Sequence, residues 1–283
     1  MNKPLKVADL NKAIYSMRIA GSGVASRRYG KAENLRMVYA IEALSRYPPA
    51  PSALVIEVGC GAGQYIKGLS IDYPNYNYLG FDFSHPGLTY ATARDSFPNI
   101  QFICSDVLRL PLPDDTVDFL FGFDIYEHLE DLESGIQESA RVIKPGGRIH
   151  AAIPCDGERS TIVGMVHKWL PFVSRLRVRY SGHVVPLTFS RVIKTFDQNF
   201  TNLEVKYSLH FISQVRDLFY WCIDGPLGLD HFDYYDSKGL PKFAWRTYRR
   251  ICYILDLLGA RESVKKDRSP KGALLCHITG IKN

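Results

Sequence analysis

An apolar run that ends in three closely spaced glycines is the feature that most restricts how this chain can fold. Residues 53–58 read Ala-Leu-Val-Ile-Glu-Val, and Gly59, Gly61 and Gly63 follow at once. A short apolar run of this kind is typical of a buried parallel strand. Glycines permit backbone angles that other residues avoid, and they let a ligand approach the main chain closely. The pattern predicts a strand, a tight loop and a helix, with a nucleotide-type ligand at the loop.

Strands and helices are expected to alternate along most of the chain that follows. We expect strands at 53–58, 76–81, 100–104, 117–123, 148–153, 203–209 and 273–281. We expect helices at 64–72, 86–96, 132–143 and 189–199. Alternation of this kind predicts an α/β fold, in which a mostly parallel sheet carries helices on both faces.

Three stretches do not fit this alternation. Residues 1–47 read as a helical segment that ends before Pro48 and Pro49. Residues 155–187 and 210–270 are too long for ordinary loops, and both carry helical patterns. We expect both to be helical insertions that form a lid over the carboxyl ends of the strands. The core domain would then consist of 48–209 and 271–283.

The net charge of +6 is unevenly distributed. Residues 1–50 carry a balance of +6 and residues 240–283 a balance of +7, whereas 51–239 carry −7. Basic ends suggest an acidic partner, such as a phosphorylated substrate, nucleic acid or an anionic membrane, although a solvated basic surface explains them equally well. The six cysteines include no Cys-x-x-Cys pair, and no long apolar stretch or signal peptide is visible. We therefore expect a cytoplasmic protein without a structural metal.

Asp82 is the second clue to the ligand. It closes the expected strand at 76–81 and follows Gly63 by 19 residues. A carboxylate at this position can accept hydrogen bonds from both hydroxyls of a ribose. A dinucleotide enzyme would use the same position, but Gln64 stands where that motif has its third glycine. The alternative is an exposed aspartate at the end of a strand.

Five segments in this order resemble the motifs of the class I S-adenosylmethionine-dependent methyltransferases. They are 55–63, 80–84, 105–107, 118–128 and 143–147. Within these segments, Glu127-His128 resembles the ubiquinone-biosynthesis type of O-methyltransferases and related small-molecule enzymes. The resemblance implies a Rossmann-like, seven-stranded, mostly parallel sheet, and S-adenosyl-L-methionine as cofactor. It covers most of 53–209 and the last strand, but neither insertion.

The resemblance also implies which residues bind the cofactor. Glu57, Gly59, Cys60, Gly61 and Gly63 would lie at its methionine part, Asp82 and Phe83 at the ribose and adenine, Ser105, Asp106 and Val107 at the adenine edge, and Phe123 and Asp124 on the methionine side.

Two histidines are candidates for catalysis. His128 follows the fourth expected strand, where the resemblance places the transferable methyl group, and His183 lies in a stretch similar to one that borders the acceptor pocket. A neutral imidazole can take a proton from an acceptor hydroxyl. Alternatives stay open, because His128 could serve packing or capping and His183 could contact the substrate or anchor a loop. Acidic neighbours of His128 suggest a metal, but a helix could not bring four such groups together.

The identity of the acceptor depends on the two insertions, whose sequences are harder to interpret. Residues 159–194 contain seven basic residues and no acidic one, interspersed with apolar residues. Such a segment can lie on an anionic membrane or cover a lipid-linked or phosphorylated substrate, or it can pack on its own domain with a solvated basic side. The leading hypothesis is methylation of a small molecule, at the oxygen of a sugar, a lipid-linked compound or a secondary metabolite. The alternatives are tRNA methylation, against which no RNA-binding module is visible, and a non-catalytic cofactor-binding protein.

Overall fold

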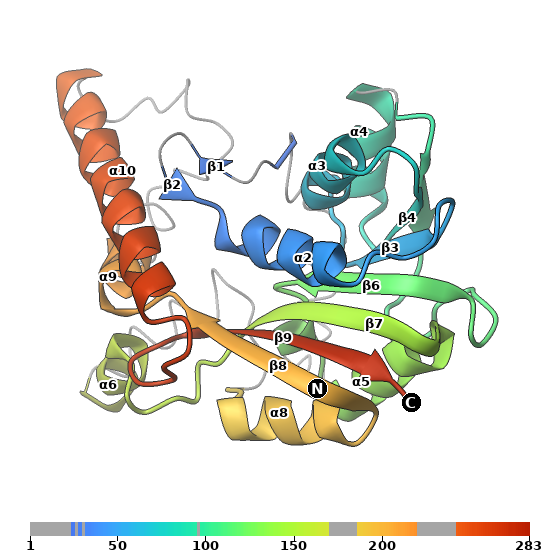
Figure 1. The fold of residues 1–283 in the computed structure, drawn as a ribbon. Helices are drawn as coiled ribbons and strands as arrows, with labels where there is room; N and C mark the ends of the chain where they lie inside the picture. The colour runs from blue at the N-terminus through green and yellow to red at the C-terminus, as the bar shows by residue number, and fades with distance from the viewer. Residues whose placement is uncertain (1–23, 26–27, 30–31, 95–96, 170–185, 220–241) are drawn as a thin grey trace, which may run out of the picture.

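A seven-stranded sheet forms the centre of the molecule in this computed structural model (Figure 1). The structure describes residues 24–25, 28–29, 32–94, 97–169, 186–219 and 242–283. The strands are β3 (Leu54–Val58), β4 (Asn77–Asp82), β5 (Ile100–Cys104), β6 (Val117–Phe123), β7 (Ile143–Pro154), β8 (Phe200–Ser208) and β9 (Leu275–Lys282). Their order is β5-β4-β3-β6-β7-β9-β8. Only β9 runs antiparallel to its neighbours, so the expected Rossmann-like, mostly parallel sheet is confirmed.

Helices cover both faces of this sheet, as expected. The described helices are α2 (Leu35–Arg46), α3 (Gln64–Asp72), α4 (His85–Arg94), the short η1 (Tyr126–His128), α5 (Leu132–Val142), α6 (Ile162–Trp169), α8 (Phe189–Asp197), α9 (Phe211–Phe219) and α10 (Lys242–Lys265). Figure 1 shows α2 and α3 on one side of the sheet and α5 and α8 on the other. Within the described part of the chain, no helix is long and apolar enough to cross a membrane.

Strand β6 shows why an uninterrupted apolar sequence suits the middle of the sheet. Side chains alternate between the two faces of a strand, and both faces of this strand are buried. Leu120 packs in the core with α5 and α8, whereas Phe119 and Phe121 pack with α2 and α3. The sheet therefore separates two hydrophobic clusters, and polar loops lie at its edge.

The N-terminal segment departs from the expectation of continuous helix. The described part contains two short strands, β1 (Arg28–Tyr29) and β2 (Ala32–Glu33), which pair antiparallel before α2 begins. The prediction of helix was wrong there, because β2 contacts α10 and this long-range contact overrides local helical preference. Residues 1–23 lie outside the described residues.

The fifth strand begins earlier than expected. Pro145-Gly146-Gly147 was expected to form a turn before a strand at 148–153, but β7 already starts at Ile143. The turn survives as an irregularity inside the strand: Gly146 has a φ of 78°, and the pairing with β6 shifts register between Val117 and Phe119.

The insertions begin and end at one edge of the sheet. Helix α6 follows the carboxyl end of β7, α9 follows that of β8, and α10 precedes β9, which starts at the same edge because it is antiparallel. Figure 1 shows the three helices together at this end. Helical structure was expected here, and 170–185 and 220–241 lie outside the described residues. The function of these insertions as a lid stays a prediction.

Candidate functional site

The loop after β3 can be built only with glycines at its key positions. Gly59, Gly61 and Gly63 have φ values of 71°, 53° and 78°. A Cβ atom on Gly59 would lie 2.8 Å from Ile125, and one on Gly63 would lie 2.7 Å from Phe102. Positive φ and close neighbours both exclude larger residues. The loop thus presents bare main chain at the carboxyl edge of the sheet.

Asp82 is fixed against this loop from the neighbouring strand. The amide of Gly61 donates to Asp82 Oδ2 at 2.7 Å, and the amide of Ser84 donates to Oδ1 at 2.7 Å. Burial raises the pKa of Asp82, while these backbone donors act in the opposite direction. The carboxylate of Asp82 is only half-buried, so its remaining lone pairs can accept hydrogen bonds from a ligand. Phe83, the next residue, is also half-buried.

Glu57 lies beneath the loop rather than on its surface. Its side chain is buried, and Oε2 accepts a hydrogen bond of 2.9 Å from the amide of Ile66 in α3. Burial raises the pKa of Glu57 well above its usual value. This contact ties β3 to the first turn of α3, and an additional contact with the methionine end of a cofactor stays a prediction. Cys60 is buried beside it, and burial likewise raises the pKa of its thiol.

The turn after β5 is organised by its own polar side chains. Asp106 Oδ1 accepts a hydrogen bond of 3.0 Å from the amide of Leu108, and the hydroxyl of Ser105 donates to the carbonyl of Arg109 at 3.1 Å. Val107 is buried. The amide of Ser105 donates to the carbonyl of Asp82, so this turn is held directly beside the ribose candidate.

Arg36 was not predicted from the sequence, but it reaches the end of β6 at this edge of the sheet. Its guanidinium lies 2.7 Å from the carboxylate of Asp124, which follows β6 and has a φ of 53°. Burial by itself lowers the pKa of Arg36, but the nearby carboxylate of Asp124 outweighs this effect, and the pKa is raised. Phe123 packs edge-on against Tyr65 of α3, with ring centroids 4.8 Å apart. Burial raises the pKa of Tyr65 to about 12. Arg36 has no local motif, because only packing of α2 on the sheet brings it to Asp124.

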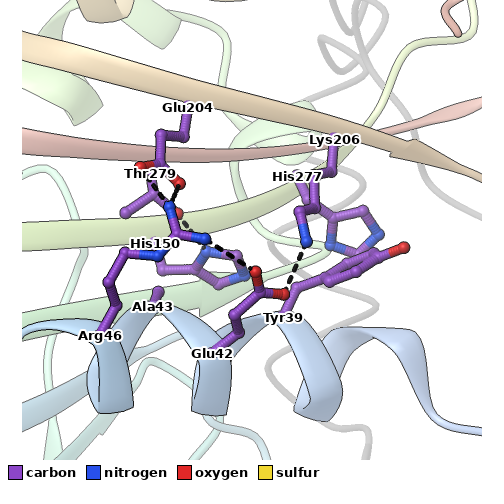
Figure 2. Close-up of a pocket in the computed structure, with 9 residues that line it drawn as sticks. All are labelled: Tyr39, Glu42, Ala43, Arg46, His150, Glu204, Lys206, His277 and Thr279. Carbon is purple, nitrogen blue, oxygen red and sulfur yellow. Dashed lines mark hydrogen bonds and ion pairs between the residues drawn. The ribbon is translucent and has the colours of Figure 1, made fainter. Parts of the chain in front are cut away.

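Ion pairs hold the other end of α2 against strand β8 (Figure 2). Arg46 contacts both carboxylate oxygens of Glu204 at 2.5 Å, and Lys206 reaches Glu42 at 2.6 Å. The same ammonium lies 4.6 Å from the ring centroid of Tyr39. These contacts surround a small cavity lined by Tyr39, Glu42, Ala43, Arg46, His150, Glu204, Lys206, His277 and Thr279. Because α2 is anchored here, its first turn is positioned to bring Arg36 to Asp124.

The structure describes only one of the two histidine candidates. His128 closes η1, directly after the Phe123–Asp124 segment, and its Nε2 lies 3.8 Å from Oε1 of the buried Glu127. Its side chain is 16% exposed and is therefore mostly buried. His183 lies outside the described residues. A catalytic role for either histidine stays a prediction.

The residues at this edge fit the cofactor that the resemblance implies. The three glycines of the loop have positive φ and leave three positions of its main chain without side chains, and the carboxylate of Asp82 accepts a hydrogen bond from the amide of Gly61 beside them. Within the described part of the chain, Nε of Arg36 is buried and has no hydrogen-bond partner. A zwitterionic nucleoside ligand supplies a carboxylate for the arginine and hydroxyls for the aspartate. Among the described residues, no group of three or more metal-ligating side chains occurs.

Comparisons with known proteins agree with this site. Residues 56–151 match a family model described as a methyltransferase domain. A trans-aconitate 2-methyltransferase of Methylobacterium nodulans is 31% identical over 165 residues, which cover 58% of this chain and 63% of the relative. A malonyl-[acyl-carrier protein] O-methyltransferase of Bacillus cereus is 26% identical, covering 44% and 46%. The YcgJ protein of Bacillus subtilis has a TM-score of 0.57 at 18% identity, covering 89% of this chain and 99% of that one.

The order and direction of the strands define a Rossmann-like α/β protein, and solved structures of similar fold agree. The resemblance to S-adenosylmethionine-dependent methyltransferases is confirmed over residues 56–151, which match a methyltransferase domain, and S-adenosyl-L-methionine is the cofactor for which a relative of this chain is named. The chain spans between about a third and two thirds of the length of the curated relatives that it matches.

Proposed function

We propose that this protein transfers a methyl group from S-adenosyl-L-methionine to an oxygen atom of a small-molecule acceptor. The observation that carries the proposal is the convergence of four loops at one sheet edge, after β3, β4, β5 and β6. The helices of both insertions lie at the same edge, where an acceptor would have to enter (Figure 1). We propose that these helices form the acceptor lid.

The cofactor supplies a methyl group on a positively charged sulfur, which is already a good leaving group. The chain's own residues therefore have to hold and orient the two reactants. In this proposal Asp82 accepts hydrogen bonds from the ribose hydroxyls, and Asp106 and Phe83 contact the adenine. Arg36 binds the methionine carboxylate, and its orphaned Nε supports this assignment. Closing the site with α2 and the insertions excludes water.

Carboxylic acids are the acceptor class to test first. The relatives reported above are named for trans-aconitate and for a malonyl group, and both are acids. A carboxylate is ionised near neutral pH, so its methylation needs no general base. A sugar or other hydroxyl acceptor has to lose a proton, and in this proposal His128 takes it. The acceptor class therefore determines what His128 does.

His128→Gln separates these possibilities. Binding of S-adenosylhomocysteine is measured by calorimetry, and methyl transfer is measured across a panel of carboxylic-acid and hydroxyl acceptors. The proposal expects unchanged cofactor binding together with turnover that falls about 100-fold for a hydroxyl acceptor and much less for a carboxylate. Cofactor binding without turnover of any acceptor would instead favour a non-catalytic protein. No cofactor binding by the unmodified protein would overturn the proposal.

A further inference from the structure

Helix α10 leaves an apolar stripe on its outer face. Ile251, Ile254 and Leu258 are 46%, 46% and 41% exposed. Spacings of three, four and seven residues place them on one side of a helix. The opposite side is occupied: Cys252 is buried, and a Cβ atom on Gly259 would lie 2.4 Å from the hydroxyl of Ser213 in α9. The stripe therefore does not belong to the interior of this domain.

The charges around the stripe are of one sign. Between residues 247 and 272, the exposed charged residues that the structure describes are all basic: Arg250, Arg261, Lys265, Lys266, Arg268 and Lys271. Helical spacing places Arg261 and Lys265 one and two turns after Leu258, on the same face, with Arg250 at its edge.

Two of the three carboxylates of this region lie near basic residues of neighbouring elements, and the third pairs with Lys266. Asp256 lies 3.8 Å from Arg216 of α9. Glu262 accepts from Lys266 at 2.8 Å and from the amide of Ile212 at 2.9 Å. Asp267 lies 3.8 Å from Lys206 of β8. The acidic side chains thus face the domain, and the outer face keeps its positive charge.

We propose that this face of α10, Arg250–Lys265, binds an anionic lipid surface. Exposed isoleucine and leucine can enter the region below the headgroups, while flanking arginine and lysine contact lipid phosphates. The stripe favours a membrane over nucleic acid, because isoleucine and leucine add nothing to phosphate contacts along a duplex. Like charges disfavour a second copy of the same face. Trp169, at the end of α6 on the same sheet edge, is 74% exposed and is a residue that membrane interfaces favour.

Vesicle sedimentation tests the proposal with the full chain. The vesicles contain either phosphatidylcholine alone or equal parts of phosphatidylcholine and phosphatidylglycerol. We expect binding only to the anionic vesicles, and loss of that binding as salt is raised. Arg261→Gln with Lys265→Gln should weaken binding about 25-fold, at about fivefold for each charge. Ile254→Ser with Leu258→Ser should weaken it about tenfold or more.

The control variant is Ile71→Ser, which removes an isoleucine of α3 that is 59% exposed, and it should bind as the unmodified protein does. Thermal unfolding of each variant should match the unmodified protein, because all five side chains are exposed. Equal binding to neutral vesicles, or unchanged binding by both α10 variants, would overturn the proposal. It would also be overturned if the α10 variants lost affinity for RNA or dissociated a dimer, without any change on vesicles. Cofactor binding is independent of every outcome, so failure here leaves the proposed reaction intact.

Discussion

The guanidinium of Arg36 lies 2.7 Å from the carboxylate of Asp124, although the two residues are 88 positions apart in the chain. Arg36 opens α2, and Asp124 follows the central strand β6 with a positive φ. The pair joins the N-terminal helix to the edge where the glycine loop lies. It also keeps a positive charge beside the methionine side of the proposed cofactor site.

Replacement of Arg36 by glutamine should weaken binding of S-adenosylhomocysteine. Loss of a hydrogen bond to a charged group costs about 1.5–3 kcal/mol, or about 10- to 100-fold in affinity. Isothermal calorimetry measures this directly. Lys282→Gln is the matched control, because it removes an ion pair with Asp115, which precedes β6 at the opposite edge of the sheet, and should leave affinity within about threefold. Equal affinities of the Arg36 variant and the unmodified protein would show that the arginine serves only α2.

Asp82→Asn should reduce cofactor affinity by about 10- to 100-fold, because an amide has only one oxygen to accept hydrogen bonds. Gly61→Val should abolish binding, since its side chain enters the loop and its φ of 53° excludes a β-branched residue. Asp197→Asn, at an exposed position of α8, is the control. The assignment of the ribose site fails if both substitutions leave the affinity unchanged.

Gly59→Ala and Gly146→Ala separate crowding from backbone strain. Both glycines have positive φ, but a Cβ atom would lie 2.8 Å from Ile125 at Gly59 and would meet nothing within 4 Å at Gly146. Gly146→Ala should cost about 1 kcal/mol of unfolding free energy, and Gly59→Ala about 2–4 kcal/mol. Urea denaturation measures both. Ile125→Ala should relieve the crowding but not the backbone strain, so in its presence Gly59→Ala should cost only the strain component, about 1 kcal/mol. Equal losses of unfolding free energy at the two positions would contradict steric crowding at Gly59.

Acidification should destabilise the protein through His150. Burial, with a smaller effect of Lys206, lowers the pKa of this imidazole to about 3. Since the unfolded imidazole binds a proton below about pH 6.5, the unfolded state takes up more protons as the pH falls. Stability should therefore drop from about pH 6.5 downward, by about 2 kcal/mol at about pH 5 from His150 alone. His277, buried beside it, adds to the loss, because burial also lowers its pKa.

Urea denaturation at neutral and acidic pH measures this dependence. His150→Gln should lower stability at neutral pH but make the pH dependence shallower by about 2 kcal/mol. His85→Gln, at an exposed position, should leave the dependence as it is. An unchanged slope in the His150 variant would mean that the imidazole is protonated in the folded state.

Much of the cofactor site was predictable from sequence because its determinants are local. The backbone angles at Gly59 and Gly63 demand glycine, and the carboxylate of Asp82 bonds to amides of its own and the preceding loop. Such requirements leave a pattern of residue types at fixed spacings. The strand alternation was readable for the same reason, since two buried faces require apolar runs.

The sequence by itself determined the class of fold, the glycine loop after β3 and the place of Asp82 beside that loop. Only the tertiary structure decided that Arg36 faces Asp124, that β1 and β2 replace part of the expected helix, and that His150 is buried beneath α2. The physical reason is that these outcomes depend on contacts between segments far apart in the chain. The sequence pattern of an amphipathic helix is the same whether a basic residue on it pairs with a carboxylate or is solvated by water. Only the packing of the helix against the sheet determines which of the two occurs.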